Sequence, residues 1–279
     1  MPPAKYAVFG QPIAHSLSPR IHAMFAQQFG IALDYSAIES SHADFARALG
    51  AFARDGGSGA NVTLPLKQDA AALCSSVSAR ARRCGSVNTL IRDGEGWRGD
   101  STDGSGFLRD IAEHHAFEPH GHRCLLLGAG GAARAVAFAL AEAGAGHVAI
   151  ANRTHERARA LAAAIGAKAQ AIGWSDLAAA DAFDLVVHAT AAGHATATFD
   201  APSPMVAVET LCYDLSYGHA AAPFLRWARA AGARHASDGL GMLIEQAADA
   251  FAIWQGRRPD TGPIRAVLRH DLAASLSGL

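Results

Sequence analysis

Short apolar runs alternate with amphipathic stretches in the N-terminal part of the chain. Residues 6–9, 33–38 and 59–62 carry the apolar and small side chains of short buried strands. Residues 20–29, which follow a proline, and residues 42–53, which end before two glycines, have the spacing of helices. The pattern therefore predicts a β-α-β-α order at this end of the chain.

Pro65 follows the third of these strands. Because proline interrupts a strand ladder, Lys67 is expected at the start of the next helix or just before it. A helical stretch is expected near residues 69–83. Residues 86–91 and 97–103 flank an Asp-Gly turn, and they predict a hairpin whose second arm ends at Asp103.

A second series of strands and helices starts after His122. It comprises strands at 123–127 and 147–151, a glycine-rich turn at 128–131, helices at 132–143 and 153–165, and further strands at 185–188, 205–209 and 235–237. The alanine-rich stretch 160–171 is also expected to be helical, because alanine is the best helix former. Strands and helices that alternate in this way predict a parallel, doubly wound sheet.

The chain has 279 residues, a length that suggests two domains. We predict an α/β fold in which residues 1–104 form a first α/β domain with a mostly parallel sheet. Residues 105–238 form a Rossmann-type doubly wound domain. Residues 239–279 form C-terminal helices that return to pack on the first domain.

The composition excludes several kinds of partner. The chain has 24 Lys+Arg, 25 Asp+Glu and 50% hydrophobic residues, so we expect no basic surface for nucleic acid. The four cysteines form no CxxC pair and the histidines lack metal-ligand spacing, which predicts reduced thiols and no metal. Without a targeting segment or a long apolar run, we expect no membrane partner and a cytoplasmic location.

A glycine-rich turn follows the first strand of the second series. Gly128 suits a tight turn, Gly130 lets the backbone approach a phosphate, and Ala133 lets the helix approach the strand. The N–H groups and the positive dipole end of that helix attract an anion. This context predicts a dinucleotide site, although the same glycines also suit a βα turn without a ligand.

The end of the following strand discriminates between cofactors. An acidic residue there binds the ribose 2′-hydroxyl of NAD, whereas an arginine accommodates the 2′-phosphate of NADP. The strand ends in Asn152, Arg153 and Thr154, so no carboxylate occupies this position, and Arg157 follows one turn later. The sequence favours NADP, unless Arg153 is simply a solvated residue at the start of a surface helix.

Polar side chains gather at the expected strand ends of the first domain. They are Asn61, Thr63, Lys67, Asn88, Thr102 and Asp103. Open α/β sheets bind ligands at this edge, so we expect these residues to line one cleft. Reduction of a carbonyl by a nicotinamide needs a proton donor and a positive charge beside the developing alkoxide, and Lys67 can supply both. A plainer interpretation has Asp103 capping a turn, and Ser16 and Ser18 capping the helix near Pro19.

The chain resembles the shikimate dehydrogenase family over nearly its whole length. The resemblance is carried by VFGQPIAHSLSPRIH at 8–22, NVTLPLK at 61–67, GSVNT at 85–89, GDSTDGSG at 99–106, GAGGA at 128–132, NRT at 152–154, YDLSY at 213–217 and DGLGMLIEQAA at 238–248. Motifs that keep one order along a chain are far more specific than any single one. The resemblance implies reversible NADPH-dependent reduction of 3-dehydroshikimate to shikimate, in chorismate and aromatic amino-acid biosynthesis.

The resemblance also implies a role for each candidate residue. Lys67 and Asp103 are the catalytic pair and also contact substrate. The further substrate-binding residues are Ser16, Ser18, Thr63, Asn88, Tyr217 and Gln246. The residues implied for NADP are Gly128, Ala129, Gly130, Gly131, Ala132, Asn152, Arg153, Thr154, Arg157, Leu215 and Gly239. We expect a small-molecule substrate and a monomer or homodimer.

Several positions depart from the usual pattern of the family. They are Ala23, Ser101, His188 and Leu215, where the family commonly has Asn, Asn, Asn and Met, and Ala79, where an acidic residue is sometimes present. None of these departures removes the proton-transfer pair. Two alternatives stay open: a quinate/shikimate dehydrogenase with broader substrate or NAD use, and a catalytically idle protein that senses shikimate-type ligands or NADP.

Overall fold

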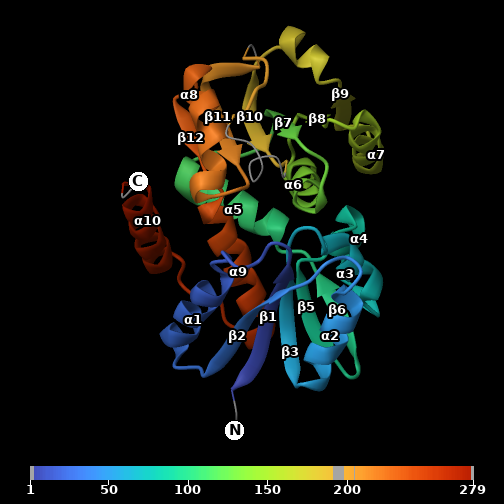
Figure 1. Cartoon of the computed structure of the whole chain (residues 1–279). Coiled ribbons are helices and arrows are strands. Elements are labelled where there is room, and N and C mark those ends of the chain that lie inside the picture. The colour runs from blue at the N-terminus through green and yellow to red at the C-terminus, as the bar shows by residue number, and fades with distance from the viewer. Residues whose placement is uncertain (1–2, 191–197, 204, 278–279) are drawn as a thin grey trace. The chain divides into compact units, whose positions relative to one another are not determined.

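The computed structural model describes residues 3–190, 198–203 and 205–277. The chain divides into two compact units, each of which uses two segments of the sequence (Figure 1). Unit 1 consists of Met1–Gly106 and Ile244–Ala266, and unit 2 of Phe107–Leu243 and Val267–Leu279. The chain passes from one unit to the other inside helices α5 (Asp103–His115), α9 (Leu240–Gln255) and α10 (Gly262–Ser277).

Unit 1 is built on a six-stranded sheet with the order β2-β1-β3-β5-β6-β4. The strands are β1 (Ala4–Gly10), β2 (Leu33–Glu39), β3 (Gly57–Val62), β4 (Ser76–Val77), β5 (Thr89–Asp93) and β6 (Gly96–Asp100). Only β5 runs against its two neighbours, β3 and β6, and the other pairings are parallel. The predicted mostly parallel sheet is confirmed.

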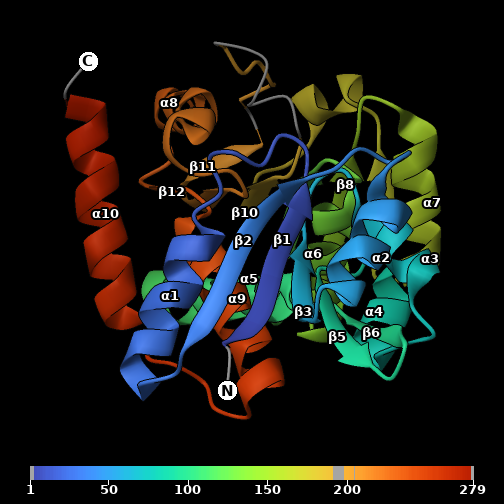
Figure 2. The same cartoon turned by 60° about the horizontal axis from the view of Figure 1, so that its bottom comes forward.

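Helices cover both faces of this sheet because successive side chains of a strand point to opposite faces. The helices besides α5 and α9 are α1 (Ser18–Phe29), α2 (Phe45–Arg54), α3 (Lys67–Leu73) and α4 (Ala79–Cys84). Phe9 of β1 packs with Phe45 and Phe52 of α2 in one core. On the other face His22 of α1 packs against Phe251 of α9. Figure 2 shows β1 and β2 between α1 and α2.

Two local predictions in unit 1 are wrong. The expected helix over residues 69–83 is interrupted by β4, because Val77 pairs with Gly99 of β6 and Ser78 caps a new helix by accepting a bond from Ala81 N. The second arm of the hairpin ends at Asp100, and Asp103 begins α5 instead. Sheet pairing and helix capping therefore override the continuous helical pattern in this segment.

Unit 2 contains six strands in the order β12-β11-β10-β7-β8-β9, and every pairing is parallel. The strands are β7 (Arg123–Leu127), β8 (His147–Ala151), β9 (Ala169–Ile172), β10 (Phe183–His188), β11 (Val206–Asp214) and β12 (His235–Ser237). Within this sheet β8 and β9 are added on one side of β7, and β10, β11 and β12 are then added on its other side. The doubly wound fold is confirmed, with its topological switch point between β7 and β10.

The helical elements of unit 2 pack on both faces of its sheet. They are α6 (Gly131–Glu142), α7 (His155–Ile165), η1 (Ser175–Ala179), η3 (Gly218–Ala221) and α8 (Ala222–Ala230). The C-terminal part of α10 (Gly262–Ser277) also belongs to unit 2. Val136 of α6 and Leu161 of α7 join one buried core, and Phe224 of α8 joins the other.

The alanine-rich stretch 160–171 is not helical throughout. Helix α7 ends at Ile165, Gly166 follows with a φ of 93°, and β9 then pairs with β8. Pairing with the edge of β8 makes Ala169–Ile172 a strand, although alanine has a low intrinsic preference for strands. No helix within the described part of the chain is long and apolar enough to cross a membrane.

Candidate active site

The polar residues of unit 1 gather because several strand ends meet at one edge of its sheet. Val62, the last residue of β3, pairs with Phe9 near the end of β1 and bonds through its N–H to Asn88 O at 2.8 Å. Asn88 directly precedes β5, which is antiparallel to β3, and its N–H bonds to Asp100 O at the end of β6. The loops after β3 and β6 therefore lie beside the residue before β5.

Lys67 and Asp103 form an ion pair at this edge. The Lys67 Nζ lies 2.5 Å from the Asp103 Oδ2, and the two side chains are 13% and 5% exposed. Each residue begins a helix, α3 for Lys67 and α5 for Asp103. As Pro65 predicted, the lysine starts a helix directly after the loop, which holds its stem in place while its ammonium group remains partly accessible.

Asn88 connects the pair to the rest of the site. Its Nδ2 donates toward Asp103 Oδ1 at 2.9 Å, Thr102 Oγ1 at 2.9 Å and Gln246 Oε1 at 3.0 Å. Its Oδ1 accepts from Thr102 N at 2.8 Å. One buried amide thus orients both the carboxylate of Asp103 and the side chain of Gln246, although Gln246 is 158 positions away in the sequence.

A close approach of two helices brings Gln246 to this site. Gly106 of α5 faces α9 so closely that a Cβ at this position would lie 2.5 Å from the backbone N of Gln246. Next to it, Ser105 Oγ donates to Asp249 Oδ2 of α9 at 2.6 Å. Neither contact was predicted from the sequence, although the glycine inside the GDSTDGSG motif is a signal of close packing.

An ion pair supports the loop that leads to Asp103. Arg80 of α4 donates to both carboxylate oxygens of Asp100, with Nε–Oδ1 at 2.7 Å and Nη2–Oδ2 at 2.8 Å. Burial raises the pKa of the Asp100 carboxyl, but hydrogen bonds from Arg80 and Ser78 outweigh burial and lower it below its usual value. The charged carboxylate of Asp100 also accepts from the Ser101 N–H, which fixes the turn before Asp103.

The expected carboxylate-binding serines lie in the loop and helix that follow β1. Ser16 Oγ accepts from Ser18 N at 3.3 Å, and Ser18 begins α1 with its side chain bonded to the Tyr35 hydroxyl. The capping residue of α1 is Leu17, which makes no side-chain cap bond. Thr63 follows β3 and contributes its N–H to Phe9 O, so it shares the edge with the serines.

In unit 2 the glycine-rich turn joins β7 to α6 at the switch point. Gly128 has a φ of 131°, a backbone conformation that L side chains rarely adopt, and Gly130 is the N-cap of α6. A Cβ at Gly130 would meet no atom within 4 Å, so internal packing does not require glycine there. The turn fits a pyrophosphate group, because unpaired helix N–H groups and an open approach coincide.

The residues expected at the adenosine end follow β8. Asn152 Nδ2 donates to Thr154 O at 2.9 Å, which closes the turn before α7. Arg153, Thr154 and Arg157 are exposed. Among the described residues neither guanidinium is ion-paired, so both are available to a phosphate.

The residues expected at the nicotinamide end also come together in unit 2. Leu215 follows β11 and bonds through its N–H to His188 O at 2.9 Å, while Gly239 N bonds to Ser216 O at 2.8 Å. Tyr217 stands next to them as the N-cap residue of η3. Within unit 2 the structure therefore groups Leu215, Tyr217 and Gly239.

Sequence reasoning missed a buried hydrogen-bonded group at the end of β10. His188 Nδ1 lies 2.9 Å from Asp214 Oδ2, and His188 Nε2 lies 2.6 Å from Thr190 Oγ1. The available signal was a histidine directly before Ala189-Thr190, which the analysis noted only as a departure from the pattern of the family.

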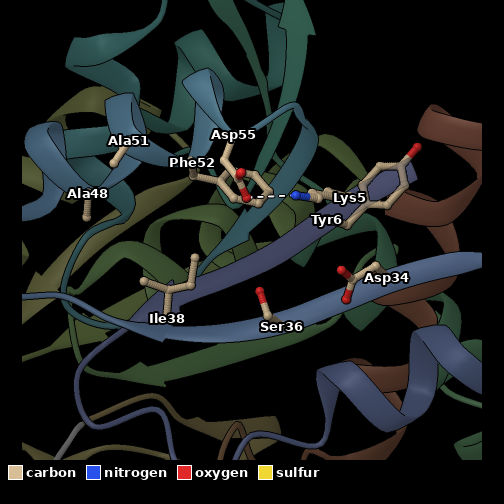
Figure 3. A pocket seen from close by; sticks show the side chains of 9 residues that line it. All are labelled: Lys5, Tyr6, Asp34, Ser36, Ile38, Ala48, Ala51, Phe52 and Asp55. Carbon is tan, nitrogen blue, oxygen red and sulfur yellow. Dashed lines mark hydrogen bonds and ion pairs between the residues drawn. The ribbon is translucent and has the colours of Figure 1, made fainter. Parts of the chain in front are cut away.

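A surface groove in unit 1 contains none of the predicted site residues. It lies between α2 and strands β1 and β2, and the ion pair of Lys5 with Asp55 crosses it (Figure 3). Its other lining residues are Tyr6, Asp34, Ser36, Ile38, Ala48, Ala51 and Phe52. In the described part of the chain no group of three or more His, Cys, Asp or Glu side chains could hold a metal.

Three family models match the chain in order. They are the shikimate dehydrogenase substrate binding domain at residues 8–90, shikimate / quinate 5-dehydrogenase at 110–216 and the shikimate 5′-dehydrogenase C-terminal domain at 239–269. A shikimate dehydrogenase (NADP(+)) of Xanthomonas euvesicatoria pv. vesicatoria (strain 85-10) is 54% identical over 273 residues, which cover 96% of each chain. The chain belongs to the shikimate dehydrogenase family. A relative of the same name from Xylella fastidiosa (strain M12) is 50% identical and covers 97% of this chain.

Solved structures show the same family likeness and some breadth of chemistry. The shikimate 5-dehydrogenase of Thermus thermophilus in complex with NADP(H) and shikimate has a TM-score of 0.84 and 36% identity, covering 96% of this chain and 99% of that one. The Ael1 enzyme of Pseudomonas putida has a TM-score of 0.86 and 40% identity, covering 96% and 97%. A 5-ketofructose reductase of a Gluconobacter strain, 29% identical with a TM-score of 0.79, covers 98% of each chain.

Proposed function

We propose that this member of the shikimate dehydrogenase family catalyses the reversible NADPH-dependent reduction of 3-dehydroshikimate to shikimate. The observation that carries the proposal is the buried pair of Lys67 and Asp103, tied through Asn88 to Gln246 at one sheet edge. High identity to relatives named shikimate dehydrogenase (NADP(+)) supports this substrate and this cofactor.

NADPH, when bound, supplies the hydride that attacks the carbonyl carbon. Lys67 then donates a proton from Nζ to the carbonyl oxygen and stabilises the negative charge that develops there. In the oxidation of shikimate Lys67 Nζ accepts the hydroxyl proton. Asp103 holds the lysine in position and accepts a hydrogen bond from a substrate hydroxyl.

The remaining polar residues distinguish the substrate from other small carbonyl compounds. We assign the carboxylate of the substrate to Ser16, Ser18 and Tyr217. Its ring hydroxyls are assigned to Thr63, Asn88 and Gln246. Hydroxyl and amide groups both donate and accept, so they can form hydrogen bonds with several substrate hydroxyls without burying an unpaired charge.

The chain's own residues would hold NADP in unit 2. Gly128, Ala129, Gly130, Gly131 and Ala132 would receive the pyrophosphate, while Leu215 and Gly239 would receive the nicotinamide end. At the adenosine end, the free guanidinium groups of Arg153 and Arg157 favour a 2′-phosphate, together with Asn152 and Thr154.

The decisive experiment offers purified protein shikimate or quinate, each with NADP⁺ or NAD⁺, and follows reduced cofactor spectrophotometrically. We expect rapid reduction with shikimate and NADP⁺ and much slower reduction with the other three pairs. Equal rates with quinate or NAD⁺ would favour a broader quinate/shikimate dehydrogenase. NADP⁺ binding without turnover of any pair would instead favour an idle ligand sensor.

The remaining partner assignments follow from the same activity. We propose a small-molecule enzyme of the cytoplasm that acts without nucleic acid or membrane, as a monomer or a homodimer. Light scattering coupled to size-exclusion chromatography measures the oligomeric state, and fractionation of cells that produce the protein measures the location.

A further inference from the structure

The hydrogen-bonded group at the end of β10 has the connectivity hydroxyl–imidazole–carboxylate. Thr190 Oγ1 lies 2.6 Å from His188 Nε2, and the other ring nitrogen, Nδ1, lies 2.9 Å from Asp214 Oδ2. The side chains of His188 and Asp214 are each 1% exposed, whereas Thr190 is partly exposed. Only the hydroxyl end of the group therefore reaches a ligand.

For a neutral imidazole, the hydrogen-bond pattern determines which way each proton points. Asp214 Oδ1 accepts from the backbone N–H of Ser216 at 2.8 Å, and Oδ2 faces His188 Nδ1. A carboxylate accepts at both oxygens, so in a neutral ring Nδ1 carries the proton and Nε2 accepts. Thr190 must then donate its only hydroxyl proton to Nε2, which leaves its lone pairs for an external donor.

Aromatic side chains hold the imidazole in this orientation. The ring stacks on Phe224 with the centroids 5.1 Å apart, and its edge meets Phe199 at 4.7 Å. The hydroxyl is consequently oriented by a ring that is itself fixed by packing and by Asp214.

Thr190 lies where the parts of the cofactor site converge. A Cβ at Gly128 would lie 3.2 Å from Thr190 N, and the neighbouring Ala189 N bonds to Leu127 O at the end of β7. On the other side, His188 O accepts from the N–H of Leu215. The threonine therefore stands at the switch point, between the glycine-rich turn and the residues assigned to the nicotinamide end.

We propose that the Thr190 hydroxyl binds the nicotinamide half of NADP as a hydrogen-bond acceptor, and that His188 and Asp214 are its positioning residues. This inference rests on the proposed function. The nicotinamide half offers two kinds of donor to such an acceptor, the carboxamide N–H and the ribose hydroxyls.

The first test measures affinity directly by titration calorimetry of NADP⁺ with Thr190→Val, which keeps the shape of the side chain. Loss of one neutral hydrogen bond corresponds to roughly a 3- to 10-fold rise in Kd. The KM for NADP⁺ should rise with it while the KM for shikimate stays unchanged. Thr210→Val is the matched control, because it removes a buried hydroxyl that bonds to Phe183 O at the start of β10.

The second test separates positioning from packing. Asp214→Asn keeps an acceptor for the Ser216 N–H but presents an N–H to His188 Nδ1, which moves the ring proton to Nε2 and turns Thr190 into an outward donor. His188→Phe retains the aromatic packing and removes both nitrogens. Each variant should raise the Kd for NADP⁺ as Thr190→Val does. Combining either variant with Thr190→Val should raise the Kd no further.

A cofactor analogue distinguishes the two donors. In 3-acetylpyridine adenine dinucleotide phosphate a methyl group replaces the carboxamide NH₂. If the carboxamide is the donor, Thr190→Val weakens NADP⁺ binding but not binding of the analogue. If a ribose hydroxyl is the donor, both bind more weakly, and either result supports the inference.

The inference is overturned if wild-type protein reduces NADP⁺ with shikimate while Thr190→Val retains wild-type Kd for NADP⁺. Additive losses in the combined variants would equally remove the positioning role of His188 and Asp214. Failure of the proposed function gives a different result, since wild-type protein itself would then not form NADPH from shikimate.

Discussion

At the scale of single residues, the chemistry depends on what surrounds Lys67. Asp103 contacts the ammonium group of Lys67, and only 13% of the lysine side chain is exposed, which is the arrangement that the proposed proton transfer requires. Asn88 fixes the second oxygen of the same carboxylate. Both oxygens of the Asp103 carboxylate therefore have a partner, one in Lys67 and the other in Asn88.

Replacing this lysine tests the assignment of proton transfer. Lys67→Ala should lower kcat for shikimate oxidation by roughly 100- to 10,000-fold, the usual contribution of a general acid–base group. Binding of NADP⁺ should persist, because the residues assigned to the cofactor lie in unit 2. Steady-state kinetics and calorimetry measure the two effects, with Lys5→Ala as a control at an exposed ion pair. Wild-type kcat in Lys67→Ala would contradict the role.

At the scale of elements, the site requires α5 and α9 to approach closely within unit 1. Gly106 permits that approach, and the Ser105–Asp249 hydrogen bond fixes it. In the same unit, α1 packs on the sheet through a buried histidine: His22 is fully buried and stacks on Tyr35 with ring centroids 4.5 Å apart. Both contacts couple the stability of an element to the shape of the site.

Gly106→Ala should impair substrate binding even though alanine favours helix. The new Cβ would approach the backbone of Gln246 to 2.5 Å, so α9 must shift and Gln246 must lose its bond to Asn88. We expect roughly a 10-fold or larger rise in the KM for shikimate, of the size that a lost buried hydrogen bond produces. Gly50→Ala in α2 is the control, since its nearest contact would be an ordinary 3.6 Å. Equal kinetics of the two variants would contradict the close-packing argument.

His22 should make the protein less stable in mild acid. Burial lowers the pKa of His22 to about 3, although the side chain of Asn61 acts in the opposite direction. The unfolded chain binds a proton at this histidine near pH 6.5 and the folded chain does not, so stability falls as the pH decreases from 6.5 toward 3. From pH 7 to pH 5 this one group should cost about 2 kcal/mol in the free energy of unfolding.

Urea unfolding of wild-type protein and of His22→Phe at the two pH values measures this effect. The phenylalanine retains a ring against Tyr35 but binds no proton. The variant should therefore lose about 2 kcal/mol less than wild-type protein over the interval. Parallel losses in both proteins would show that His22 titrates normally in the folded state.

At the scale of the whole molecule, the proposed catalytic pair and the proposed cofactor site belong to different units. Unit 1 contains the paired Lys67 and Asp103, and unit 2 contains the doubly wound sheet with its glycine-rich turn. A ligand that binds only the folded state stabilises the unit that holds it, so cofactor selectivity should be measurable as thermal stability.

NADP⁺ should raise the Tm of the protein more than NAD⁺ does at the same concentration. At 100 times its Kd a ligand stabilises the folded state by about 2.7 kcal/mol. Arg153→Gln should reduce the shift with NADP⁺ and leave the shift with NAD⁺ unchanged, because only NADP⁺ carries the 2′-phosphate. Differential scanning fluorimetry measures all four shifts. An Arg153→Gln variant that lowers both shifts equally would indicate a structural role for this residue.

The sequence by itself determined the features that depend on local chain chemistry. Pro65 placed Lys67 at the start of a helix, and the run from β7 through Gly128 to α6 predicted a βα unit. At the end of β8 the chain has Asn152 and Arg153 in place of a carboxylate. Periodicity, turn residues and capping act over a few positions, so they can be recognised without a fold. The same local rules erred at β4 and β9, where pairing with a distant strand decided the outcome.

Only the tertiary structure decided how distant side chains meet. Three contacts join segments that are far apart in the sequence. They are the bond from Asn88 to Gln246, the close approach of Gly106 to α9, and the connection of Thr190 through His188 to Asp214. Such contacts arise from strand order and helix packing, which bring polar groups together in a buried environment where each must find a partner. Residue types and their spacing therefore predicted which polar groups lie at the sheet edge, while the fold determined what orients them.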